Sequence, residues 1–326
     1  MNNKKSANLT TSLVDIKKYL DTCVNLRPNT LIMDDLKWKY MVRSALRGKN
    51  ILLLGPTGCG KTLAAQTVAK VLGKESTFFY FNLGATQDAR SALIGNTHFD
   101  KSTGTLFKES SFVKAIRTPN AIILLDEISR SHHDGVNILM TVLDDLQRYL
   151  RLDEKEDSEV VKVAQGVTFI ATANVGNEYT ATRVMDRALL SRFPVKIEMA
   201  PLDMNSEYNL LKSRFNIDNE DQLNILKAVC EISDHTRVQV KRDDSKLTNF
   251  IPTRTTVEIA ELIVDGFNLV EIAETTIYPN FSEDGGVDSE RTYVKQLVQK
   301  HVKVDAKSAI FNDPINNINN TTQPPF

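Results

Sequence analysis

The segment 55–62 constrains the fold of this chain more than any other. An apolar run at 51–54 precedes it and a helical pattern at 63–70 follows it. Its eight residues fit the pattern G-x-x-x-x-G-K-[ST], in which a glycine-rich turn brings backbone N–H groups around phosphate oxygens at a helix N-terminus. The residues predicted to bind a nucleotide are Gly55, Pro56, Thr57, Gly58, Cys59, Gly60, Lys61 and Thr62. Lys61 would reach the β- and γ-phosphates, and Thr62 would hold Mg²⁺.

Composition narrows the class of protein. The chain has 326 residues, 41% of them hydrophobic, which is enough for two domains, and its net charge of −1 indicates no overall attraction to nucleic acid. Three scattered cysteines predict no disulfide framework. No apolar stretch approaches the roughly 18 residues that span a membrane. These features together predict a soluble cytoplasmic protein without membrane insertion.

Short apolar runs alternate with helical segments in the first 200 residues. Continuously apolar strands in such an alternation predict an α/β fold, with a parallel five-stranded sheet covered by helices on both faces. The predicted strands are 51–54, 78–81, 121–125, 167–171 and 195–199, and the later helices are 205–216, 221–237, 253–278 and 287–304. We therefore predict an N-terminal helical segment (1–33), a nucleotide-binding α/β domain (34–200), an all-α domain (201–305) and a disordered tail (306–326).

Two segments interrupt the α/β alternation. Residues 95–108 and 148–165 each have the pattern of a β-hairpin set into a helical stretch, and the second carries an acidic tip at 153–159. The alternative is that both segments are ordinary solvated loops.

Polar residues follow two of the apolar runs. Asp126 and Glu127 end one run, at the edge where parallel α/β sheets bind ligands. Beside a P-loop, Asp126 would hold Mg²⁺ and Glu127 would polarise the water that attacks the γ-phosphate. Asn174 ends the run at 168–173 and could hydrogen-bond the γ-phosphate or that water.

Three arginines follow: Arg183, Arg187 and Arg192. A guanidinium supplied by a neighbouring subunit can neutralise charge that develops during phosphoryl transfer. For any one of these arginines taken alone, a surface salt bridge is the competing interpretation.

The order of these motifs resembles the AAA+ ATPases over about residues 34–278. Within that family the sequence is most similar to the MoxR-type group, whose relatives include chelatase ATPase subunits and McrB-like motors. The segments 126–130 (Asp-Glu-Ile-Ser-Arg) and 188–193 (Ala-Leu-Leu-Ser-Arg-Phe) carry this likeness, and the two hairpins fall where that branch has insertions.

The resemblance implies further roles for single residues. Asn174 matches sensor 1, Arg192 matches the arginine finger with Arg187 as the fallback, and Arg254 matches sensor 2 of a helical lid. Asn82 sits where the family often has a polar switch for the catalytic glutamate. The role of Arg130 is left open.

The resemblance also implies an activity: hydrolysis of ATP with Mg²⁺ in a homo-oligomeric ring, most simply a hexamer. The first hypothesis for its function is a MoxR-like motor that remodels a protein client, with von Willebrand A-domain proteins as one class of partner. A nucleic-acid motor is the alternative, because Lys101, Lys108 and Lys114 could line a pore. A third alternative is a nucleotide-gated scaffold with little turnover, against which the intact Glu127 argues.

Overall fold

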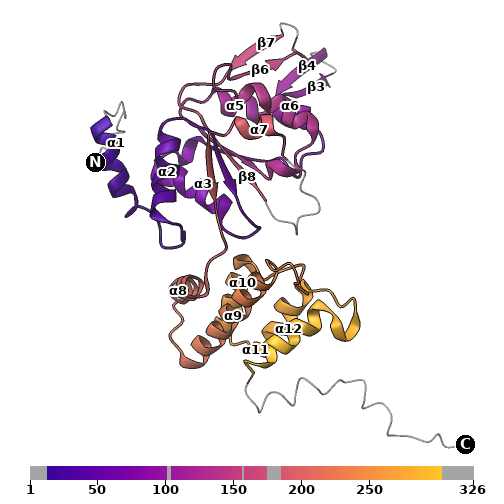
Figure 1. Cartoon of the computed structure of the whole chain (residues 1–326). Coiled ribbons are helices and arrows are strands. Elements are labelled where there is room, and N and C mark those ends of the chain that lie inside the picture. Colours follow the sequence, from indigo (N-terminus) through magenta and orange to yellow (C-terminus); the bar gives the residue numbers. More distant parts are fainter. Residues whose placement is uncertain (1–12, 101–103, 156–157, 175–184, 303–326) are drawn as a thin grey trace, which may run out of the picture. The chain divides into compact units, whose positions relative to one another are not determined.

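The computed structural model describes residues 13–100, 104–155, 158–174 and 185–302. The chain divides into two compact units, Met1–Ala200 and Pro201–Phe326 (Figure 1). The predicted tail at 306–326 and Arg183 lie outside the described residues. None of the helices within the described ranges combines the length and apolar character needed to cross a membrane.

A parallel sheet of five strands forms the centre of the first unit, which confirms the predicted fold class. Its strands lie in the order β2-β5-β8-β1-β9, and all four neighbouring pairs are parallel. All six residues of β8 are buried, as a central strand covered on both faces requires. The strands are β1 (Ile51–Leu54), β2 (Phe78–Asn82), β5 (Ile122–Asp126), β8 (Thr168–Ala173) and β9 (Val195–Glu198).

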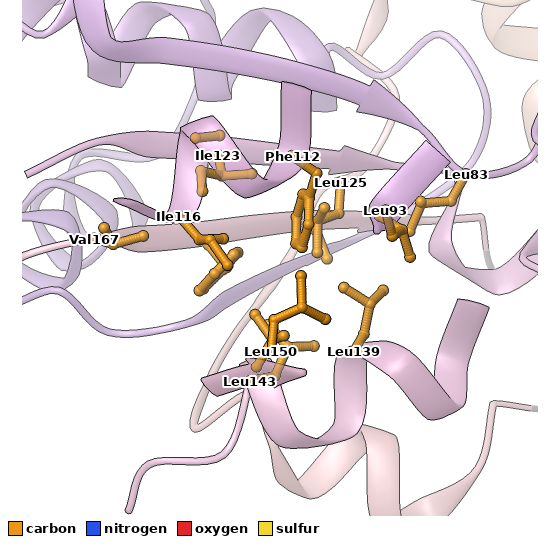
Figure 2. Close-up of a cluster of buried hydrophobic side chains, with 14 of the residues drawn as sticks. Leu83, Leu93, Phe112, Ile116, Ile123, Leu125, Leu139, Leu143, Leu150 and Val167 are labelled. Atoms are coloured by element: carbon orange, nitrogen blue, oxygen red, sulfur yellow. The ribbon is translucent and has the colours of Figure 1, made fainter. Parts of the chain in front are cut away.

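Helices cover both faces of this sheet. Successive strand residues point to opposite faces, so Ile123 and Leu125 join one hydrophobic cluster while Ile122 and Leu124 join another. Figure 2 shows part of the first cluster, with β5 side chains beside Phe112. The helices are α1 (Leu13–Cys23), α2 (Asp35–Leu46), α3 (Lys61–Val71), α4 (Ala89–Leu93), α5 (Ser111–Arg117), α6 (His133–Val142) and α7 (Arg187–Ser191), with short turns η1 (Glu75–Thr77) and η2 (Ile128–Arg130).

Two antiparallel hairpins are inserted in the first unit. β3 (Gly95–Asp100) pairs with β4 (Gly104–Glu109), and β6 (Tyr149–Leu152) pairs with β7 (Glu159–Lys162). Arg117 of α5 forms ion pairs with Glu109 of the first hairpin and Glu159 of the second. The hairpins therefore lie side by side at one end of the unit (Figure 1).

The second unit is helical. Its helices are α8 (Met204–Phe215), α9 (Glu220–Gln239), α10 (Thr253–Val264), α11 (Leu269–Ile272), the π-turn η3 (Ala273–Ile277), η4 (Tyr278–Asn280), η5 (Gly286–Asp288) and α12 (Glu290–Gln299). A buried ion pair joins two of them: Glu207 of α8 accepts two hydrogen bonds of 2.8 Å from the Arg237 guanidinium of α9. Thr256 of α10 donates to the same carboxylate at 2.7 Å.

The prediction of one continuous helix over 253–278 is wrong. α10 ends at Val264, and a new helix begins after Asn268, whose side chain accepts from the N–H groups of Val270 and Glu271. The Glu271 side chain accepts from the Asn268 N–H in return, which completes a capping box and begins a separate helix. The helix predicted at 287–304 likewise begins later, at Glu290, because Ser289 caps it.

Candidate active site

The P-loop connects β1 to α3 as the sequence predicts. Gly55 begins the loop with a φ of +155°, and a Cβ at this position would lie 2.2 Å from the carbonyl oxygen of Met199. Only glycine allows the loop to pass this close to the chain that leaves β9. Gly60 precedes the first helical residue, Lys61, so the N-terminus of α3 opens directly onto the loop.

Lys61 lies inside the curve of the loop. Its Nζ donates to the carbonyl oxygens of Gly55 (2.8 Å) and Pro56 (2.7 Å). Burial lowers the pKa of Lys61, and burial also raises the pKa of the neighbouring Cys59 thiol. The raised pKa keeps Cys59 protonated, which suits a small packing residue better than a redox-active one.

Three hydroxyl groups surround the Asp126 carboxylate. Thr62 Oγ1 of the P-loop lies 3.4 Å from Oδ2, Tyr80 OH donates to Oδ2 at 3.0 Å, and Thr172 Oγ1 donates to Oδ1. Burial, and then the charge of Asp126, raise the pKa of Tyr80. A carboxylate and a threonine hydroxyl this close form an oxygen donor set that fits a hard cation such as Mg²⁺.

Glu127 adopts an unusual backbone conformation beside Asp126. Its φ of +55° is rare for a residue with a side chain, and such conformations gather at functional sites. Its N–H donates to Thr172 Oγ1 at 3.0 Å. Its carboxylate is 3.3 Å from Arg130 Nη1. A Cβ on Gly84 would lie 2.3 Å from Glu127 Oε2, so Gly84 leaves the space that this carboxylate fills.

Asn82 lies opposite Asp126 in the sheet register. Its Oδ1 accepts from the N–H of Ala85 at 3.1 Å, and its carbonyl oxygen accepts from the hydroxyl of Thr86. The side chain therefore caps the turn that carries Gly84 against Glu127. Asn82 thus reaches Glu127 only indirectly, through the turn at Gly84. The switch role that the resemblance implies for Asn82 stays a prediction.

Asn174 comes directly after β8 at the P-loop edge of the sheet. The carbonyl oxygen of the preceding residue, Ala173, accepts from the N–H of Gly55 at 3.3 Å. The half-buried Asn174 is thus one residue away from a direct contact with the start of the P-loop.

Arg192 lies at the other end of the sheet. It precedes β9, whose first residue Val195 pairs with Ile51, the first residue of β1, whereas the P-loop follows the last residue of β1. A strand of this length separates the two ends by about 13 Å. Arg187 is exposed at the start of α7, and Arg254 belongs to the second unit as the second residue of α10. The structure therefore groups the P-loop, Asp126, Glu127 and Asn174 within the first unit, and it places Arg192 of that unit at the opposite end of the sheet.

Sequence reasoning missed Tyr80, Thr172 and Gly84. The only signal for Thr172 was its position two residues before Asn174 on the same strand, and for Tyr80 its position two residues before Asn82. Each of these spacings puts the paired side chains on one face of a strand.

Comparisons with known proteins identify the family of this chain. Residues 50–193 match the AAA domain of the dynein-related subfamily. The chain is 31% identical over 228 residues to the putative chaperone BssE of Thauera aromatica. The aligned segment covers 68% of this chain and 72% of BssE. This chain belongs to the AAA proteins of that subfamily.

This AAA protein also matches a protease homolog and a solved structure. It is 29% identical over 194 residues to the mitochondrial Lon protease homolog 1 of Dictyostelium discoideum. That alignment covers 56% of this chain and 19% of the homolog. Among solved structures, the Hsp104–ADP complex of S. cerevisiae superposes with a TM-score of 0.47 and 16% identity, over 61% of this chain and 39% of that chain.

Proposed function

We propose that this AAA protein is a Mg²⁺-dependent ATPase of the MoxR type that works as a hexameric ring and remodels a protein partner. The observation that carries the proposal is the distance of 3.4 Å between Thr62 Oγ1 of the P-loop and the Asp126 carboxylate, with Glu127 next in the chain. P-loop ATPases hold the metal with a hydroxyl and a carboxylate placed in this way.

Each site residue has a role in this proposal. The loop 55–62 binds the phosphates, and the ammonium of Lys61 pairs with the β- and γ-phosphate oxygens. Thr62 and Asp126 would hold Mg²⁺, which when bound neutralises phosphate charge. Glu127 orients the attacking water and takes its proton, while Asn174 hydrogen-bonds the γ-phosphate or that water. Arg254 of the second unit would contact the γ-phosphate in its own subunit.

The place of Arg192 supports an oligomer. Because Arg192 precedes β9, it lies at the opposite end of the sheet from its own P-loop. It would act on the nucleotide of a neighbouring subunit, and a head-to-tail arrangement that closes gives a ring.

The hairpins support a protein partner. Phe99 of β3 is 76% exposed and Leu106 of β4 is 51% exposed, and the neighbouring hairpin carries the acidic residues Asp153 and Glu154. Exposed apolar side chains suit a polypeptide better than a phosphate backbone, and the carboxylates of Asp153 and Glu154, which pair with Arg151 and Arg90, leave no excess positive charge there to attract phosphates. The relative from Thauera aromatica, named a putative chaperone, points the same way.

Glu127→Gln tests the proposed chemistry. The amide keeps the size of the side chain but cannot take a proton, so turnover should fall at least about 100-fold. Affinity for ATP, measured by isothermal titration calorimetry, should remain within about threefold. The matched control is Glu75→Gln, an exposed glutamate of η1. Wild-type turnover by the Glu127→Gln variant would remove Glu127 from the mechanism.

Stimulation experiments test the class of partner. ATPase activity is measured alone, with single-stranded DNA or RNA, and with candidate proteins, including von Willebrand A-domain proteins. Stimulation by a protein supports the proposal, and stimulation by nucleic acid alone would replace the client with a nucleic-acid strand. Undetectable hydrolysis under every condition would favour the nucleotide-gated scaffold.

A further inference from the structure

Arg192 is held by a carboxylate of its own chain. Its Nη2 lies 3.1 Å from Oδ2 of Asp144, in the loop that follows α6. The two side chains are 32% and 17% exposed, so the pair is partly shielded from water. The pair engages one end of a guanidinium that has five N–H donors in all.

The backbone beneath this pair is also fixed. Asn50, buried just before β1, donates through Nδ2 to the carbonyl oxygen of Leu143 at 2.7 Å and to that of Arg192 at 2.9 Å. The Asn50 side-chain amide thus links the backbone of Leu143, which precedes Asp144, to the backbone of Arg192. Neither partner can move far without breaking one of these two hydrogen bonds, of which the bond to Leu143 is buried.

The second oxygen of Asp144 has a different task. Oδ1 accepts from the N–H groups of Leu146 at 2.9 Å and Gln147 at 3.0 Å. These bonds, together with the charge of Arg192, hold the pKa of Asp144 below its usual value, so the carboxylate stays charged. Oδ1 of Asp144 therefore stabilises the loop, whereas Oδ2 holds Arg192.

We propose that Asp144 is a positioning residue that sets the direction in which Arg192 presents its guanidinium to the nucleotide of the neighbouring subunit. The inference rests on the proposed action of Arg192 between subunits. An unheld arginine samples many rotamers, and fixing them costs conformational entropy. Asp144 restricts them before the neighbour binds, assisted by longer contacts from Nε to the Met140 carbonyl oxygen (3.5 Å) and from Nη1 to the Ser191 hydroxyl (3.4 Å). One N–H on each of Nη1 and Nη2 is left for phosphate oxygens.

Asp144→Asn isolates the arginine-holding role. The amide oxygen can still accept from Leu146 and Gln147, but the NH₂ group that replaces Oδ2 cannot accept from Arg192. We expect kcat to fall roughly 10- to 100-fold while KM for ATP stays within about twofold, because a misplaced catalytic group affects the transition state more than nucleotide binding. The oligomer mass measured by light scattering should be that of the wild type.

Asp145→Asn is the matched control. It makes the same charge change one residue away, on a half-exposed side chain whose nearest cation, Lys49 Nζ, is 4.0 Å distant. Its kinetics should equal those of the wild type. An Asp144→Asn enzyme with wild-type kcat, or with a higher kcat, would overturn the inference, and the higher value would mean that Asp144 restrains Arg192 rather than orients it.

Mixed oligomers show whether Asp144 acts across the interface. Asp144→Asn subunits keep Glu127, and Glu127→Gln subunits keep the Asp144–Arg192 pair. After subunit exchange at equal amounts, turnover should recover to about a quarter of the wild-type value, since that fraction of interfaces combines both intact parts. No recovery, under conditions where Arg192→Ala subunits do recover, would place Asp144 in its own subunit's site and sink the inference.

Arg192→Ala distinguishes the role of Asp144 from the action of Arg192 between subunits. If it is inactive while Asp144→Asn is fully active, only the role of Asp144 fails. If Arg192→Ala itself has full activity, the proposed function between subunits fails as well.

Discussion

The Thr172 hydroxyl donates to the carboxylate of Asp126, and the same oxygen accepts the N–H of Glu127 at 3.0 Å. One buried side chain therefore sets both acids of the site, the first through its carboxylate and the second through its left-handed backbone. Two consecutive residues at the end of β5 are aligned by a residue of the neighbouring strand.

Thr172→Val should lower turnover roughly 10- to 100-fold, because an isosteric methyl group leaves the Glu127 N–H without its acceptor and the Asp126 carboxylate without one donor. Steady-state ATPase kinetics with circular dichroism as a check on folding measure this effect. Thr172→Ser retains the hydroxyl and should stay within about threefold of wild type. Equal losses in both variants would mean that packing, not the hydroxyl, matters at this position.

Tyr80→Phe should change the dependence on Mg²⁺. The phenol donates to Asp126 Oδ2 at 3.0 Å, and partners that orient a metal ligand typically contribute about 10-fold or more to metal affinity. We expect the Mg²⁺ concentration for half-maximal turnover to rise about tenfold, with kcat at saturating Mg²⁺ nearly unchanged. Tyr40→Phe, at an exposed position on α2, is the control. An unchanged Mg²⁺ curve would show that the Tyr80 hydroxyl does not orient Asp126.

Glu207→Gln should destabilise the second unit by about 3–5 kcal/mol, because it leaves the buried Arg237 guanidinium without its countercharge. Urea unfolding followed by far-UV circular dichroism should show an earlier transition. The fluorescence of Trp38, the single tryptophan, reports on the first unit and should show its transition at the wild-type urea concentration. Glu220→Gln, at an exposed position of α9, controls for the loss of charge. An unshifted circular dichroism transition would contradict this role of the pair.

The strands and the P-loop were predictable because their signals are local. A run such as 51–54 is apolar on both faces, and the glycine spacing of 55–62 belongs to one loop, so neither depends on a distant partner. The division between α10 and α11 was readable in principle from the capping pair Asn268 and Glu271. The helical spacing of apolar residues continues through Val264 and Phe267, so the pattern does not reveal the break between the two helices.

The supporting residues were not predictable because their partners are remote in sequence. Thr172 lies 46 residues from Asp126, and Asn50 lies 142 residues from Arg192. A hydroxyl or an amide has no distinctive spacing of its own, and only the strand register brings it to the site. Sequence patterns therefore predicted the candidate reactive groups, whereas the fold was needed to find the residues that hold them.

The central claim is that Arg192 completes the site of a neighbouring subunit. Arg192→Ala alone should lose roughly a thousandfold in turnover while retaining ATP affinity, as expected for an arginine finger. The most direct measurement is the ATPase activity of Arg192→Ala mixed with Glu127→Gln at equal amounts after subunit exchange. Recovery to about a quarter of wild-type turnover is the predicted result, because only interfaces with both intact residues can hydrolyse ATP. A mixture no more active than its two components would contradict a shared site.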